Sequence, residues 1–280
     1  MPDRTLGQMW RHLQTLLLPV DPAPHEGRRL VAHVLGLAEA ALPLHEHTTF
    51  PAEKEKALEA LVARRLTGAP LAYVLGIAPF WTRDWQVREG VLIPRPDTET
   101  LLQAVLDVIP PARATRVAEI GVGSGAVVGS LLLERPLATA VGTDTSPTAV
   151  AVAGENLRLA GVNDRARLME TSLLEGVEGP FDVIFSNPPY IGEADYAALE
   201  ASVRAFEPAE ALVAGDDGLD VYRSLMPSAA AKLAPGGWLM VEIGWQQGDA
   251  VTALFRQQGL QQVRVLPDLA GRDRVVVGRG

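Results

Sequence analysis

Residues 116–126 read RVAEIGVGSGA, a short apolar run that ends in three closely spaced glycines. Short apolar and β-branched runs are typical of buried strands, and glycine lets the backbone turn sharply with a positive φ. The apolar run Ala126–Leu133 predicts a helix directly after this turn. A strand, a glycine turn and a helix in this order begin a parallel α/β sheet in which a ligand can lie against the turn.

The same alternation of short strands and helices continues to the C-terminus. Strands are expected at Arg116–Ile120, Thr139–Thr143, Arg167–Glu170, Phe181–Ser186, Trp238–Ile243, Val263–Leu266 and Arg274–Val277. Helices are expected at Glu99–Ile109, Ala126–Leu133, Pro147–Leu159, Leu219–Leu233 and Gln246–Gln258. The fold class is therefore α/β, with a mostly parallel seven-stranded sheet covered by helices on both faces.

The first 70 residues carry a helical pattern instead. Apolar residues at helical spacing predict helices over residues 4–18, His25–Leu37 and Ala52–Leu66. Residues 71–93 are aromatic and alternating, which predicts a β-hairpin connector. We therefore expect a small all-α N-terminal domain at residues 1–70, the connector at 71–93 and the α/β domain at 94–280. Such an appended bundle either recognises a macromolecular substrate or only packs, and the sequence leaves both open.

The composition excludes several classes of site. The chain has 280 residues, no cysteine and five scattered histidines. Disulfides, thiolate metal sites and cysteine nucleophiles are therefore excluded, and no metal is expected. No apolar run approaches the roughly 18 residues of a membrane span, and the N-terminus lacks a basic segment followed by an apolar one. We expect a cytoplasmic protein without membrane contact.

Acidic residues are concentrated in the α/β domain. Residues 1–86 hold nine acidic and nine basic residues, whereas residues 87–280 hold 25 acidic and 16 basic residues and carry the entire net charge of -9. A domain that binds the phosphates of nucleic acid usually has the opposite sign. Direct nucleic-acid binding is therefore not expected.

The glycine turn and the end of the next strand define a candidate cofactor site. Asp144 ends that strand, 23 residues after Gly121, and its carboxylate can accept hydrogen bonds from both hydroxyls of a ribose. A dinucleotide would place its pyrophosphate on the helix N-terminus, where the neighbouring Glu119 is unfavourable. S-adenosylmethionine has no phosphate and carries cationic amino and sulfonium groups. Charge therefore favours S-adenosylmethionine, with S-adenosylhomocysteine as its product.

Residues 181–190 read FDVIFSNPPY, an apolar run that ends at two prolines. Neither proline can donate to a sheet ladder, so the predicted strand stops and presents Asn187 and Tyr190 at its carboxyl end. The amide of Asn187, the carbonyl of Pro188 and the ring of Tyr190 could together hold a planar amide or amidine group. By itself the stretch fits a strand-ending turn equally well.

Together these motifs give the chain a family resemblance. It resembles the protein-(glutamine-N5) methyltransferases that modify the Gly-Gly-Gln loop of class 1 peptide chain release factors. The resemblance covers nearly the full length and rests on Pro94–Glu99, Glu119–Gly125, Asp144 with Ser146-Pro147, Asn187–Ile191, Glu207-Pro208 with Ala211-Leu212, Gly218-Leu219, Tyr222-Arg223, Pro235–Gly237, Glu242–Gly244 with Gln247, and Gly271–Arg274. It implies an S-adenosylmethionine-dependent methyltransferase (Rossmann-like) fold at residues 94–280. It also implies a helical N-terminal domain that recognises the release factor, and a reaction that supports translation termination.

The resemblance also assigns site residues. Catalytic roles fall to Asn187, Pro188 and Tyr190, and substrate contacts to the same residues with Pro189. The implied cofactor-binding residues are Glu119, Gly121, Val122, Gly123, Ser124, Gly125, Asp144, Ser172, Leu173 and Asn187. The family usually has threonine at the position of Val122 and an acidic residue at that of Ser172. No metal is implied.

Four other functions share parts of this pattern. An adenine-N6 methyltransferase would present the same loop to an exocyclic amine, but the acidic domain and the lack of a basic, aromatic-rich module disfavour it. A glutamine methyltransferase of a ribosomal protein is the second alternative. The segments Glu207–Leu212 and Gly271–Arg274 resemble the release-factor enzymes more closely and therefore disfavour it. A silent binding module on the same scaffold would not need Asp144 and Asn187. An NAD-dependent oxidoreductase needs an acid or base for hydride transfer, and no histidine follows His47.

Overall fold

The structure, a computed structural model, describes residues 4–20 and 23–280. The chain divides into two compact units between Ile77 and Ala78, and the two are described separately. Within the described ranges, no helix is both long and apolar enough to span a bilayer.

The first unit is helical. Its elements are α1 (Leu6–Leu16), η1 (Leu18–Val20), α2 (Glu26–Leu35), η2 (Glu39–His45), η3 (Ala52–Lys54), α3 (Glu55–Leu66) and α4 (Leu71–Leu75). The three longest confirm the predicted helices. Thr5 and Gln8 form a capping box at the start of α1, which satisfies two backbone donors there. The core is apolar, but Glu26 is also buried and pairs with Arg65 of α3, which offsets part of the cost of burying its charge.

Only part of the connector at 71–93 forms the predicted β-hairpin. Its first residues form helix α4, which ends at Gly76 with a φ of 73°. The hairpin is confined to β1 (Ile77–Phe80) and β2 (Arg83–Gln86), with Trp81 at a φ of 58° in the turn. A short buried apolar run does not distinguish strand from helix, and here the left-handed glycine ends a helix.

The second unit is built on the expected seven-stranded sheet. Its strands are β3 (Thr115–Ile120), β4 (Ala138–Asp144), β5 (Ala166–Glu170), β6 (Phe181–Ser186), β7 (Leu233–Glu242), β8 (Gln261–Pro267) and β9 (Asp273–Arg279). The spatial order is β5-β4-β3-β6-β7-β9-β8, and only β9 runs antiparallel to its neighbours. The chain order reverses between β3 and β6. Ligands of parallel α/β sheets bind beyond the carboxyl ends of the strands at such a point.

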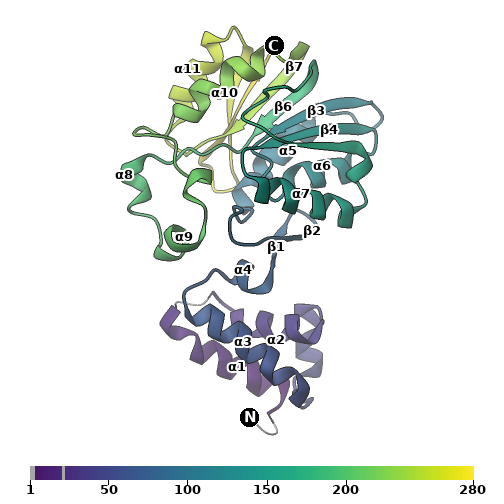
Figure 1. Cartoon of the computed structure of the whole chain (residues 1–280), viewed down its shortest axis with the longest axis vertical. Helices are drawn as coiled ribbons and strands as arrows, with labels where there is room; N and C mark the ends of the chain where they lie inside the picture. The colour runs from purple at the N-terminus through teal and green to yellow at the C-terminus, as the bar shows by residue number, and fades with distance from the viewer. Residues whose placement is uncertain (1–3, 21–22) are drawn as a thin grey trace. The chain divides into compact units, whose positions relative to one another are not determined.

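Helices cover both faces of this sheet (Figure 1). One layer holds α5 (Glu99–Val108), α6 (Ala126–Glu134) and α7 (Pro147–Ala160), and the other holds α10 (Asp220–Ala230) and α11 (Gly248–Gln257). The shorter elements are η4 (Pro96–Thr98), η5 (Asn163–Arg165), α8 (Glu193–Tyr196), α9 (Ala201–Phe206) and η6 (Ala209–Ala211).

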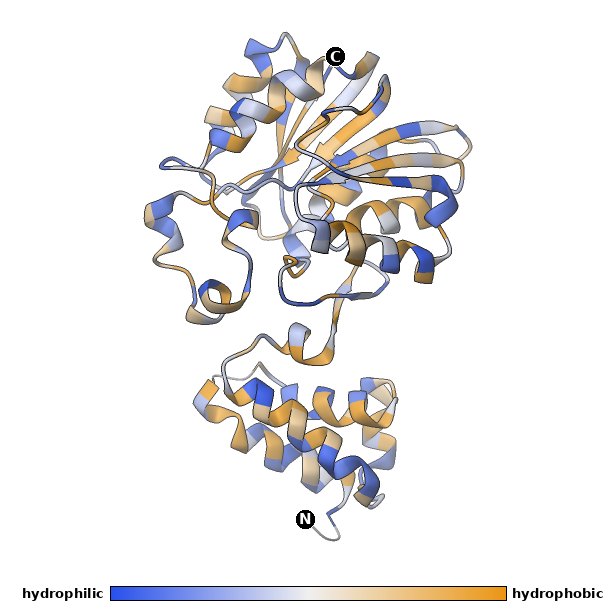
Figure 2. Cartoon of the chain, viewed as in Figure 1, coloured by the Kyte–Doolittle hydropathy of each residue, from blue (hydrophilic) through white to orange (hydrophobic). Residues whose placement is uncertain are grey.

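Strand β6 shows why the central strands read as continuous apolar runs. Val183 and Phe185 pack into the layer of α5, α6 and α7, whereas Ile184 packs into the layer of α10 and α11. Both faces of the strand are therefore buried, as in other parallel sheets. Hydrophobic residues accordingly follow the central strands in Figure 2. This rigid core fixes the positions of the strand ends that carry the site.

Candidate active site

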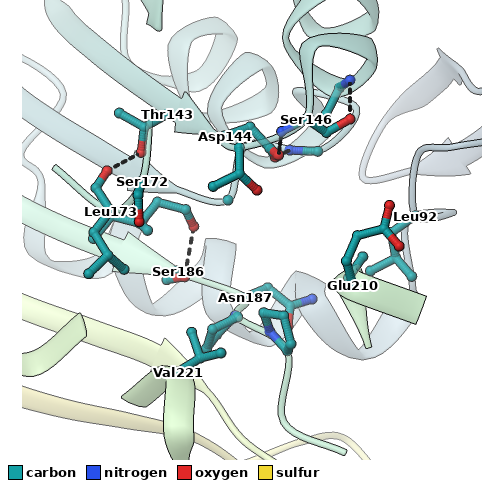
Figure 3. Close-up of a pocket in the computed structure, with 18 of the residues that line it drawn as sticks. Leu92, Thr143, Asp144, Ser146, Ser172, Leu173, Ser186, Asn187, Glu210 and Val221 are labelled. Atoms are coloured by element: carbon teal, nitrogen blue, oxygen red, sulfur yellow. Dashed lines mark hydrogen bonds between the residues drawn. The ribbon is translucent and has the colours of Figure 1, made fainter. Parts of the chain in front are cut away.

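A cavity of about 420 Å³ opens at the carboxyl ends of β3, β4, β5 and β6 (Figure 3). The predicted site residues that line it are Gly121, Gly123, Asp144, Ser172, Leu173, Asn187, Pro188 and Pro189. They come from four strand ends that are widely separated in the sequence. The sheet therefore gathers most of the predicted cofactor and substrate residues around one space.

The glycine turn is held close to the end of β4. Gly121 has a φ of 74° and Gly123 a φ of 53°, so the turn uses backbone conformations that favour glycine. The Gly123 N–H donates to Oδ2 of Asp144 at 2.9 Å, and the Ser146 N–H donates to Oδ1 at 2.9 Å. Each carboxylate oxygen keeps a second lone pair. Asp144 is therefore fixed by two backbone bonds and can still accept two hydroxyl donors.

Apolar groups form much of the remaining wall. Val91 and Leu92 line it from the loop before η4, and Val221 from α10. Leu173 has a φ of 50°, and its carbonyl accepts the Thr143 hydroxyl at 2.6 Å, which anchors this part of the wall to β4. In Figure 3, Leu173 and Val221 lie on the left of the view, with Asp144 above them and Asn187 to their right. Such a surface suits one face of a planar base.

The charge of the cavity is negative. Asp144, Glu210 and Asp220 line it, and no lysine, arginine or histidine occurs among the described residues that do. A pyrophosphate would meet carboxylates without a cationic partner. S-adenosylmethionine presents a ribose, a flat base and positive charge, and each of these has a complementary feature here. The donor set of the cavity therefore fits S-adenosylmethionine.

Glu119 does not lie where the sequence suggested. We expected its carboxylate to face the cationic groups of the cofactor, but it is buried outside the cavity lining, with 2% of the residue exposed. Its Oε2 accepts the Val128 N–H at 3.0 Å and so caps the first turn of α6. Burial raises the pKa of Glu119 well above its usual range. In this structure the Glu119 carboxylate therefore caps α6, and its contact with the cofactor stays a prediction.

Three further predicted residues also lie behind the wall. Val122, Ser124 and Gly125 do not line the cavity. The Ser124 carbonyl accepts the Asn156 side-chain amide at 2.8 Å, and Gly125 begins α6 with a φ of 77°. A Cβ at Gly125 would lie 3.0 Å from that of Ala153. These residues shape the turn and let α6 approach α7, and their contact with the cofactor stays a prediction.

The loop after β6 separates two cavities. Asn187, Pro188 and Pro189 line both the first cavity and a second one of about 250 Å³, whereas Tyr190 lines only the second. The Asn187 Nδ2 donates to the Thr98 hydroxyl oxygen at 3.1 Å. The Tyr190 carbonyl accepts the Gln247 side-chain amide at 2.9 Å. The loop is thus fixed from both sides.

Glu242 is a buried group behind this loop that the sequence analysis did not single out. Its Oε1 accepts the Tyr190 hydroxyl at 3.4 Å. Burial raises the pKa of Glu242 to about 7, although the Thr98 hydroxyl and Arg274 act in the opposite direction. Burial likewise raises the pKa of Tyr190. Thr98 and Glu242 both lie in segments that carry the family resemblance. The sequence therefore marked both segments, but it did not predict that these two side chains lie close together.

An ion pair between a buried carboxylate and a partly exposed arginine lies at the edge of both cavities. The Glu207 carboxylate accepts the Ile93 N–H at 3.2 Å and pairs with Arg95. Leu92, which precedes Ile93, and Pro208, which follows Glu207, both line the first cavity. The pair therefore links the loop before η4 to the loop after α9.

No group of three or more potential metal ligands occurs in the described part of the chain.

The fold of the second unit is shared with known methyltransferases. It is similar to a methyltransferase from Pyrococcus furiosus, with a TM-score of 0.52 and 18% identity over 70% of this chain and 88% of that one. It is also similar to the 16S rRNA N2 G1207 methyltransferase of T. thermophilus, with a TM-score of 0.52 and 19% identity over 72% and 49% of the two chains. The family description "Methyltransferase small domain" matches residues 96–213. Fold and site thus define a methyltransferase of the S-adenosylmethionine-dependent class.

The sequence relatives narrow this class. "Release factor glutamine methyltransferase" from Cereibacter sphaeroides is 42% identical over 93% of this chain and 92% of its own, and that from Geobacter sulfurreducens is 42% identical over 93% and 90%. The family description "PrmC N-terminal domain" matches residues 8–76. The chain belongs to the family of release factor glutamine methyltransferases. The adenine-N6 and ribosomal-protein alternatives are not favoured.

Proposed function

We propose that the protein transfers the methyl group of S-adenosylmethionine to the side-chain amide nitrogen of the glutamine in the Gly-Gly-Gln motif of class 1 peptide chain release factors, in support of translation termination. One observation carries this proposal beyond family membership. Asn187 lies between an acidic cavity and a second cavity, and its Nδ2 is bonded to Thr98. Its Oδ1 therefore remains available to accept a hydrogen bond from a group that lies between the two cavities.

The first cavity would hold the cofactor. Asp144 would accept the ribose hydroxyls through the lone pairs that Gly123 and Ser146 leave free. The base would lie against Leu173 beside Ser172, and the bare backbone of Gly121 permits close approach. S-adenosylmethionine supplies an electrophilic methyl group on a positively charged sulfur. S-adenosylhomocysteine remains as the product, and no metal is required.

The second cavity would receive the glutamine side chain. A glutamine amide has two N–H donors, and the Asn187 Oδ1 and the Pro188 carbonyl provide two acceptors. Tyr190 and Pro189 line the same space and would pack against the planar amide. An amide nitrogen is a poor nucleophile because its lone pair is delocalised. Fixing this nitrogen in line with the methyl group and excluding water can lower the activation barrier by several kcal/mol, on the order of 7–11 kcal/mol for ideal alignment.

The helical first unit would recognise the body of the release factor. Its match to "PrmC N-terminal domain" and its nearly neutral charge support a role in protein rather than nucleic-acid contact. We place the three parts of the chain at residues 1–70, 71–93 and 94–280. Release factors act in translation, so we assign the enzyme to the cytoplasm, without direct nucleic-acid binding.

The proposal predicts separate roles for the cofactor and the loop. Asn187→Ala should leave binding of S-adenosylmethionine intact and abolish transfer, because it removes an acceptor for the substrate. The assay incubates the enzyme with purified release factor and labelled donor, and maps the modified residue by mass spectrometry. Asn163→Ala, an exposed asparagine of η5, is the matched control and should behave like wild type. Near-normal turnover of Asn187→Ala would refute the role of the loop.

A further inference from the structure

Asn187 is held from behind by a threonine outside the predicted site. Thr98 is 3% exposed, and its hydroxyl oxygen accepts the Asn187 Nδ2–H at 3.1 Å. An asparagine amide can present either its oxygen or its NH2 group to a hydroxyl, because a hydroxyl both donates and accepts. The direction of the Thr98 proton therefore decides which end of the Asn187 amide faces the substrate.

The Thr98 hydroxyl is close enough to the Glu242 carboxyl to lower its pKa by hydrogen bonding. Glu242 is 1% exposed, and its Oε1 is within reach of the Tyr190 hydroxyl. Its Oε2 is buried without a hydrogen-bond partner among the described residues. A buried acceptor of this kind requires a donor, and the unassigned proton of Thr98 can supply one.

We propose that Glu242 and Thr98 are positioning residues that set the orientation of the Asn187 amide. An ionised carboxylate can only accept, so it takes the Thr98 proton. Thr98 is then left with lone pairs alone and can bind only the Nδ2 of Asn187. The Asn187 Oδ1 is consequently turned to the substrate. This inference rests on the proposed function, in which that oxygen accepts the glutamine amide.

The relay has a consequence for pH. A protonated Glu242 can donate to Thr98, which frees the Thr98 proton for the Asn187 Oδ1 and turns the amide NH2 toward the substrate. The NH2 group of Asn187 would then face the NH2 group of the substrate glutamine, and two donors cannot form a hydrogen bond. The charged and titratable groups around Glu242 are Tyr190, Tyr222 of α10, Asp97 of η4 and Arg274 of β9, which also pairs with Asp268. Burial keeps the pKa of Glu242 at about 7, so turnover should rise as the pH rises through that value.

The first test compares two substitutions at Thr98. Thr98→Val keeps the shape and removes the hydroxyl, and should lower kcat on the order of 100-fold, since small misplacements of a reacting group have effects of this size. Thr98→Ser keeps the hydroxyl and should stay within about threefold of wild type. Calorimetry should give both variants the wild-type affinity for S-adenosylmethionine. Equal turnover of the valine and serine variants would overturn the proposal.

The second test measures kcat against pH for the full chain with a purified release factor. Wild type should show a rise with a midpoint of about 7, and Glu242→Gln, which cannot ionise, should lose that step. An unchanged step in Glu242→Gln would overturn the role of Glu242 even where Thr98→Val fails to fold. A wild-type enzyme that does not methylate the release factor would refute the proposed function itself. The two failures are therefore distinct.

Discussion

Asp144 offers the most direct test of the cofactor site. Its carboxylate accepts the Gly123 and Ser146 N–H groups at 2.9 Å each, and two lone pairs remain for the ribose hydroxyls. A hydrogen bond to a charged group contributes about 1.5–3 kcal/mol. Two such bonds at the lower limit give about 3 kcal/mol, so Asp144→Ala should raise the Kd for S-adenosylmethionine roughly 150-fold.

The asparagine variant separates the two roles of this carboxylate. Asp144→Asn keeps the shape and can still exchange hydrogen bonds with ribose hydroxyls. Its NH2 group must, however, face either the Gly123 N–H or the Ser146 N–H, both of which are donors. An unpaired donor of this kind costs about 1–3 kcal/mol. This cost is the same with and without the ligand, so the asparagine variant should lose stability but keep more of its affinity for S-adenosylmethionine than the alanine variant.

Calorimetric titration with two ligands makes the assay specific. S-adenosylhomocysteine has the same ribose without the sulfonium charge. Each substitution should therefore raise the Kd of both ligands by the same factor. Asp164→Ala removes an exposed carboxylate of η5 and is the matched control, expected to bind both ligands normally. Unchanged affinity in Asp144→Ala, or a loss confined to S-adenosylmethionine, would refute the ribose assignment.

Three further predictions concern packing, protonation and substrate choice. A Cβ at Gly129 would lie 2.3 Å from the Trp85 ring, whereas the nearest atom at Gly154 is 3.8 Å away; Gly129→Ala should lower the free energy of unfolding by about 1–3 kcal/mol in thermal melts, and Gly154→Ala should not lower it. The pKa of Glu242 is raised from 4.5 to about 7 by burial, so its contribution to stability is complete below pH 4.5 and is lost as the pH rises through 7. Denaturant unfolding should therefore show that wild type loses about 2 kcal/mol more than Glu242→Gln between pH 5 and pH 8. A release factor with glutamate in place of the target glutamine should be methylated at least about 10⁴-fold more slowly, because two acceptors would face a carboxylate; comparable mass-mapped labelling of both substrates would contradict the loop assignment.

The sequence predicted what is local or periodic. The central strands could be recognised because both faces are buried, as at Phe181–Ser186, and the glycine turn because positive φ values select glycine. Asp144 and Asn187 could be placed near one another because carboxyl ends of parallel strands meet at one edge. Short elements such as α8 and α9 have too few residues for a period to appear.

Contacts across the chain could not be predicted in this way. The hydrogen bond between Thr98 and Asn187 joins residues 89 positions apart, and no local pattern contains it. Glu119 shows the complementary limit. Its position near the end of β3 is evident from the sequence, but only the packing of α6 decides that its carboxylate accepts the Val128 N–H.

The charge of the site explains why the acceptor should be a neutral amide. The cofactor cavity carries three carboxylates, and the loop adds the Asn187 oxygen and the Pro188 carbonyl. These groups attract a cationic donor and N–H groups, and they repel a carboxylate or phosphate. An adenine amine would also offer two N–H donors, so the loop alone does not exclude it. The acidic second unit adds the discrimination, since a nucleic-acid substrate must bring its phosphates to the same surface, whereas a glutamine on a protein loop brings none.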